Sequence, residues 1–165
     1  RSFRYREAPD VRFVEIHYHP KNEGDEFLEI RNFESRPVDL SSWSVTGVGY
    51  RFPSNTTLAP NSTIVLAKDP QALRKKHPTL KVDRVFGPYK SFLSNSGETI
   101  RLLDNGVSAD GRRDHPETIN VVRYTDRAPW PTEADGQGPS LELDGFSKEN
   151  RGEWRASKGV GAPGR

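Results

Sequence analysis

The sequence predicts an all-β protein, an immunoglobulin-like antiparallel β-sandwich with one short helix. Apolar and polar residues alternate over 14–20 and again over 26–32, and turn residues recur, with 14 Gly and 13 Pro in 165 residues. Alternation with a period of two places the apolar side chains on one face of each strand, as a half-buried sheet requires. About nine short strands separated by turns are typical of the immunoglobulin type of sandwich.

The first core strand is expected over 11–19 and its hairpin partner over 25–33, across a polar turn. The run at 63–67 is mainly apolar, which indicates a strand buried on both faces, and Val65 is expected to face the core between the two layers. Residues 1–10 are expected to be an incoming linker or an extra edge strand, and 11–164 to be the sandwich domain. Further strands are expected at 38–46, 50–52, 57–58, 84–86, 99–103, 120–124 and 140–143.

One helix is predicted over residues 70–77. Asp69 stands at the N-cap position, and Pro70 occupies the first helical position, where its missing N–H is not needed. The last turn carries Lys75, Lys76 and His77, whose positive charge suits a helix C-terminus. We expect this helix to cover an open end of the sandwich.

Composition limits the kind of partner. The chain has 25 basic and 23 acidic residues and a net charge of +2, so it carries no large field, and we expect no nucleic acid partner. No apolar run approaches the roughly 18 residues that span a bilayer, so no membrane insertion is expected.

Cysteine is absent, which excludes disulfides, thiol nucleophiles and thiolate metal sites. The chain also contains no Met, even at its first position, and we expect it to be a segment or a processed product of a longer protein.

Polar residues share one face of the first hairpin. Glu15, His17 and His19 lie at strand spacing, and Glu29 would face the same way on the neighbouring strand. A His-x-His pair with a carboxylate can bind Zn, and Glu15 with Glu29 and loop oxygens could bind Ca. Glu15, His17 and Glu29 are therefore candidate metal ligands of a metal-binding domain or a metal-dependent hydrolase. The simpler interpretation, which we favour, is a solvated outer face with cross-strand ion pairs.

Aromatic residues suggest a second kind of site. Trp43 in the third predicted strand is expected to anchor the core. Trp130 and Trp154 are candidate ligand-binding residues, because an exposed indole face can stack on a sugar ring or contact a protein. Asp135, in the Gly-rich loop after Trp130, is expected to fix a turn by accepting backbone N–H groups. No Ser lies in a Gly-x-Ser-x-Gly elbow, and we expect no enzyme activity.

Several short motifs, in this order, resemble the bacterial branch of the lamin tail domain family. They are EIHYHP at 15–20, EFLEIRN at 26–32, PVDLSSW at 37–43, LSNSGE at 93–98, APWP at 128–131, ADG at 134–136, NRGEW at 150–154 and GAPG at 161–164. The resemblance spans roughly residues 11–164, and the ordered set is far more specific than any single motif.

The resemblance implies an immunoglobulin-like sandwich without enzymatic activity. Bacterial modules of this family are parts of large exported proteins, which implies an extracellular or cell-surface location and a role in adhesion or interaction. The expected partner is a protein or a cell-surface polysaccharide. A passive structural spacer is the remaining alternative. No coiled-coil heptads are present, so the resemblance does not extend to a lamin filament.

Overall fold

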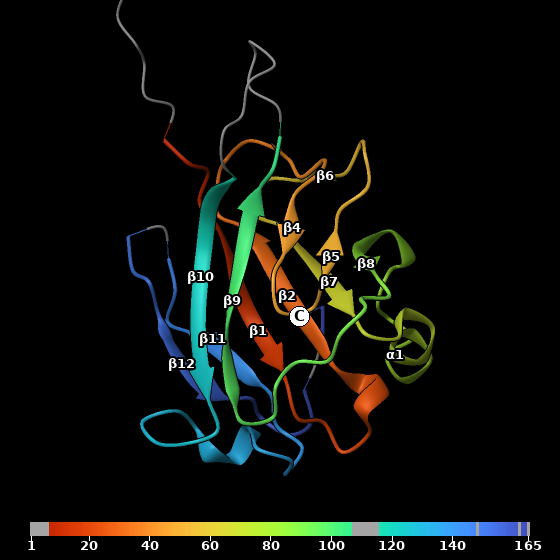
Figure 1. Ribbon diagram of the computed structural model, residues 1–165, viewed down its shortest axis with the longest axis vertical. Coiled ribbons are helices and arrows are strands. Elements are labelled where there is room, and N and C mark those ends of the chain that lie inside the picture. The colour runs from red at the N-terminus through yellow and green to blue at the C-terminus, as the bar shows by residue number, and fades with distance from the viewer. Residues whose placement is uncertain (1–6, 107–115, 148, 162, 165) are drawn as a thin grey trace, which may run out of the picture.

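The computed structural model describes residues 7–106, 116–147, 149–161 and 163–164, so most of the expected N-terminal linker lies outside the described residues. Two β-sheets pack face to face, with the four-stranded sheet in front of the six-stranded sheet in Figure 1. The six-stranded sheet contains, in spatial order, β12 (Glu153–Ala156), β11 (Leu141–Asp144), β1 (Val11–His17), β2 (Phe27–Asn32), β7 (Thr63–Ala67) and β8 (Val85–Phe86).

The second sheet is smaller and is completed by a separate strand pair. Its spatial order is β10 (Glu117–Thr125), β9 (Gly97–Asp104), β4 (Ser44–Val45) and β5 (Tyr50–Arg51), while β3 (Val38–Asp39) pairs with β6 (Thr57–Leu58). All the strand pairs are antiparallel except β7 with β8, which are parallel. The predicted fold class, an antiparallel sandwich of immunoglobulin type with one short helix, is confirmed.

The main core lies between the two sheets. Ile16, Leu28 and Trp43 belong to it, and each is at least 97% buried, as the alternation of the first hairpin and the position of Trp43 predict. Val65 is also buried, but it belongs to a second cluster on the opposite face of the six-stranded sheet. The expectation that Val65 faces the main core is therefore wrong.

Helix α1 (Pro70–Lys76) begins where the sequence predicts. Asp69 accepts a hydrogen bond from the N–H of Ala72 at 3.0 Å, which satisfies one of the free donors of the first turn. Leu73 packs with Phe27 and Val65 on the outer face of the six-stranded sheet. The helix thus covers a sheet face at the β7–β8 edge, and the expectation that it closes an open end is wrong (Figure 1).

Several predicted strands have different bounds in the structure. The run at 38–46 is divided into β3 and β4 by a turn in which Ser42 has a φ of 65°. Strand β1 ends at His17, two residues early, so His19 leaves the sheet. Strand β12, which extends the six-stranded sheet beyond β11, is not predicted by the sequence patterns. Three single turns of 3-10 helix lie at Glu23–Asp25, Val82–Arg84 and Thr132–Ala134.

Candidate functional site

The first candidate is the polar face of the first hairpin. Glu15 lies directly opposite Glu29 in the β1–β2 pair and opposite Glu142 in the β1–β11 pair. Their side chains point away from the main core, as expected, yet Glu15, His17 and Glu29 are only 4%, 2% and 5% exposed. The expectation of a solvated outer face is therefore wrong.

The C-terminal part of the chain supplies hydrogen-bond donors and acceptors to this buried face. The Ser140 hydroxyl donates to Glu15 Oε1 at 2.5 Å, and the Gly164 N–H donates to Glu29 Oε1. His17 Nε2 donates to the Gly138 carbonyl at 3.1 Å. These contacts meet the requirement that buried polar groups be hydrogen-bonded.

The C-terminal segment that covers this face includes Ser140, Gly161 and Gly164, and we call it the covering segment. Its close packing depends on glycine. A Cβ atom added at Gly161 would lie 2.9 Å from His17 Nδ1 and 3.2 Å from the Cβ of Ser140. His17 Nδ1 is buried and forms no hydrogen bond with a described residue. The backbone at Gly161 therefore lies directly over the imidazole ring.

Burial shifts the protonation equilibria of this face. Loss of solvation, followed by the charge of Glu15, raises the pKa of Glu29 to about 8, although the Gly164 N–H opposes the shift. Burial lowers the pKa of His17 to about 4, against the opposing effect of the Gly138 carbonyl. At neutral pH the imidazole is therefore uncharged, and protonation of Glu29 is favoured.

The structure does not assemble the predicted metal ligands into a recognisable metal site. Over the described ranges, no group of three or more His, Cys, Asp and Glu side chains is arranged to hold a metal ion. His19 lies apart from His17, and its Nδ1 is 2.7 Å from Asp135 Oδ1. Asp135 was expected to fix its turn by accepting backbone N–H groups, and its contact in the structure is instead with the side chain of His19.

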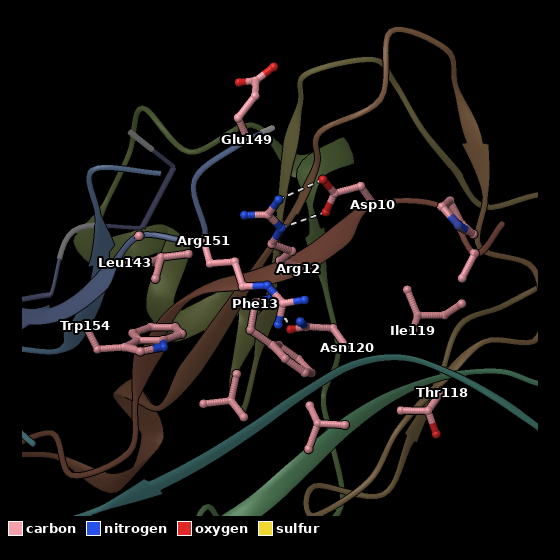
Figure 2. A pocket seen from close by; sticks show the side chains of 15 residues that line it. Asp10, Arg12, Phe13, Thr118, Ile119, Asn120, Leu143, Glu149, Arg151 and Trp154 are labelled. Atoms are coloured by element: carbon pink, nitrogen blue, oxygen red, sulfur yellow. Dashed lines mark hydrogen bonds and ion pairs between the residues drawn. The ribbon is translucent and has the colours of Figure 1, made fainter. Parts of the chain in front are cut away.

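The second candidate is a groove of about 730 Å³ at one side of the sandwich, which we call the edge groove (Figure 2). It lies between β10, the start of β1 and the β11–β12 hairpin. Its lining residues are Ala8, Pro9, Asp10, Arg12, Phe13, Thr118, Ile119, Asn120, Val121, Val122, Leu143, Glu149, Arg151, Gly152 and Trp154.

A β-bulge positions the floor of the edge groove. The register of β1 shifts between Phe13 and Glu15, so the ladder with β2 is interrupted there. Asn120 of β10 compensates, because its Oδ1 accepts the N–H of Phe13 at 3.0 Å. This contact ties the two sheets together and leaves the rest of β10 open to the groove.

Both tryptophans singled out from the sequence lie at this side of the molecule. Trp154 lines the edge groove, and Trp130 packs against it in a tilted geometry, with ring centroids 6.0 Å apart and an interplanar angle of 36°. Both rings are half-buried and pack on the main core. Trp154 is thus accessible from the groove, while Trp130 supports it without lining the groove.

The two arginines of the edge groove, Arg12 and Arg151, differ in their ion pairing. Arg12 donates to both carboxylate oxygens of Asp10, at 2.7 and 2.8 Å, and its guanidinium lies 4.4 Å from the ring centroid of Phe33. Arg151, by contrast, is exposed and forms no ion pair with any described residue. In Figure 2 it extends from the hairpin loop toward Asn120. Arg151 is therefore available to an incoming carboxylate.

Three groove residues were not predicted from the sequence: Ile119, Val121 and Arg151. One signal was present, because Val121 and Val122 are adjacent in a strand that otherwise alternates, so one of them must face outward. Val122 is buried in the core and Val121 is 47% exposed. Arg151 carried no such signal, since its position depends on the fold of the β11–β12 hairpin.

Comparison with known proteins identifies the family. The model of the Lamin Tail Domain matches residues 6–124, which include every strand from β1 to β9 and nearly all of β10. The comparisons with curated proteins and with solved structures find no match. No helix in the described part of the chain is long and apolar enough to cross a membrane. The family is one of immunoglobulin-like interaction modules and is not a known class of enzymes. The chain belongs to the Lamin Tail Domain family.

Proposed function

We propose that this chain is a non-catalytic interaction module of a larger exported bacterial protein, where it serves adhesion at the cell surface by binding a partner protein in the edge groove. One observation carries the proposal. The edge groove combines an accessible aromatic ring, Trp154, with a charged group that has no ion-pair partner among the described residues, Arg151. Aromatic residues and Arg are the side chains most enriched at the energetic centres of protein interfaces.

A protein partner fits this groove better than a polysaccharide. A sugar ring needs an open aromatic face, but Trp154 is half-buried and Trp130 packs against it. The groove lining is mixed, with Ile119 and Val121 beside Asn120 and Arg151. Such a mixture of apolar and polar groups is the ordinary composition of a protein interface.

Selection from a phage library of random 12-residue peptides on the immobilised chain would test the site. Binders are expected to lose about tenfold or more in affinity for Arg151→Glu and Trp154→Ala, because each substitution removes an anchor. Phe92→Ser is the matched control, since Phe92 is 52% exposed beside Lys68, away from the groove lining.

Arg151→Glu is the decisive variant, because Trp154 also packs on the core and its removal could loosen the fold. If the binders keep their affinity for Arg151→Glu and lose affinity for Phe92→Ser, the interaction site lies outside the edge groove. A glycan array probed with the same variants would support a polysaccharide instead if reproducible binding depended on Trp154. Selection of no binder at all would favour the passive spacer.

A further inference from the structure

Strand β10 has one unpaired edge in the described part of the chain. Among the described strands it pairs only with β9, and the edge groove runs beside Thr118 to Val122 on its other side. In Figure 1, β10 stands at the margin of the front sheet with β12 behind it. A nine-residue edge strand is long enough to serve as a template for another extended chain.

The register shows which backbone groups β10 offers. The Arg101 N–H donates to Thr46 Oγ1 at 3.0 Å, and the Arg101 carbonyl accepts the Thr46 N–H at 3.0 Å, so both groups point away from β10. Val121 is the residue opposite Arg101. The two therefore form a non-hydrogen-bonded pair, and the N–H and C=O of Val121 point to the free edge. By alternation those of Arg123 do so as well.

The two sides of this edge differ in chemistry. On the inner side lies the edge groove, with Trp154 and Leu143. On the outer sheet face, Arg101 and Arg123 are exposed, and neither forms an ion pair with a residue that the structure describes. Their outward direction follows from the burial of their neighbours Ile100, Leu102, Val122 and Tyr124 in the core.

We propose that an extended segment of the partner protein adds to the free edge of β10 as a further strand, and that this segment alternates apolar and acidic residues. Alternate side chains of an added strand point to opposite sides. One set would enter the edge groove beside Trp154, and the other would lie beside Arg101 and Arg123. The inference rests on the proposed function and specifies how that partner binds.

Charge favours a different chain over a second copy of this one. If two β10 edges paired with each other, their arginines would share the outer face of the joined sheet, and like charges on one face oppose pairing. An acidic segment would instead meet complementary charges at the same positions, and complementarity of this kind provides specificity.

The fluorescein-labelled peptide acetyl-(Val-Glu)5-amide would serve as the probe, with anisotropy as the readout. Two controls are a peptide of identical composition with Val and Glu in separate blocks, and (Val-Lys)5. We expect the alternating acidic peptide to bind the chain at least about tenfold more tightly than either control.

Two substitutions test the mode of binding. Val121→Pro removes the outward N–H without breaking a hydrogen bond to β9, so it should abolish peptide binding while thermal unfolding stays cooperative. Val121→Thr, which keeps the N–H, should retain binding. Joint Arg101→Glu and Arg123→Glu substitution should reverse the preference toward (Val-Lys)5, which a merely unfolded variant could not do.

The outcomes separate this inference from the proposed function. Strand addition would be overturned if the alternating peptide did not bind, or if it bound Val121→Pro as tightly as the native chain. In either case, library binders that still depend on Arg151 would leave the edge groove as the interaction site. Equal binding of the alternating and block peptides would also overturn it, because charge alone would then explain the affinity.

Discussion

Two regions of the molecule, the polar outer face of the first hairpin and the edge groove, use their polar groups in opposite ways. On the outer face, Glu15, His17 and Glu29 are buried and bind Ser140, Gly138 and Gly164 of the same chain. In the edge groove, Arg151 is exposed without an ion pair among described residues. The difference teaches that polar residues indicate a binding surface only where the chain has not already supplied their partners.

The contrast predicts its largest effect on stability at Ser140. Ser140→Ala removes the hydroxyl that donates to the buried carboxyl of Glu15, and we expect a loss of about 1.5–3 kcal/mol in the free energy of unfolding. Chemical denaturation measures this loss. Ser91→Ala, at an exposed position, is the control, and an equally small loss for both variants would mean that Glu15 and Ser140 are more accessible to water than their burial indicates.

Glu29→Gln should change how stability depends on pH. Because the pKa of Glu29 is raised from 4.5 to about 8, the folded state holds more protons than the unfolded state between these values, so the native chain loses stability as pH rises through this window. Gln carries no such charge. We expect the variant to gain about 1–3 kcal/mol relative to the native chain between pH 5 and 8.

Glu142→Gln is the matched control for this pH dependence, because Glu142 lies in the same row of the sheet but is exposed. Denaturation curves at several pH values would show the gain for Glu29→Gln and little change for Glu142→Gln. If the two variants behaved alike across the window, burial would not be the cause of the raised pKa.

Gly161→Ala tests the fit of the covering segment. The added methyl group would lie 2.9 Å from His17 Nδ1, so the segment or the imidazole must shift, and we expect a loss of about 1–2 kcal/mol. Gly159→Ala tests backbone strain without crowding, since its φ is 83° and no atom lies within 4 Å of an added Cβ. Thermal unfolding would measure the loss of stability for each variant. Chemical-shift changes at His17 in Gly161→Ala, but not in Gly159→Ala, would distinguish crowding of the imidazole from backbone strain.

Arg151→Ala should have the smallest effect on stability, within about 0.5 kcal/mol, because the side chain is exposed and forms no ion pair with a described residue. Its effect on library binders should nevertheless be large, since Arg151 is expected to meet the partner. A clear loss of stability in denaturation experiments would show instead that Arg151 supports the β11–β12 hairpin.

Much of the fold follows from local patterns, but the state of the site does not. The alternation around Ile16 and Leu28 predicts which residues share a face, and Asp69 predicts the start of α1. Neither pattern shows what covers a face. The groups that bury Glu15 and Glu29 come from Ser140 and Gly164, more than 100 residues away in the chain.

Two further features were beyond the reach of single-sequence patterns. Strand β12 has four residues and follows Gly152, which is too little alternation to distinguish a strand from a loop. The bulge near Phe13 places both Val14 and Glu15 on the outer face, between Phe13 and Ile16 of the main core, which strict alternation forbids. Both features, strand β12 and the bulge in β1, depend on how the strands pair in the folded protein.

An NMR titration of the nitrogen-15-labelled chain with a library-selected binder tests most directly whether the edge groove is the interaction surface. We predict chemical-shift changes at the amides of Val121, Arg123 and Arg151 and at the indole N–H of Trp154. Changes confined to His17 and the other outer-face residues, with the edge groove unaffected, would contradict the account.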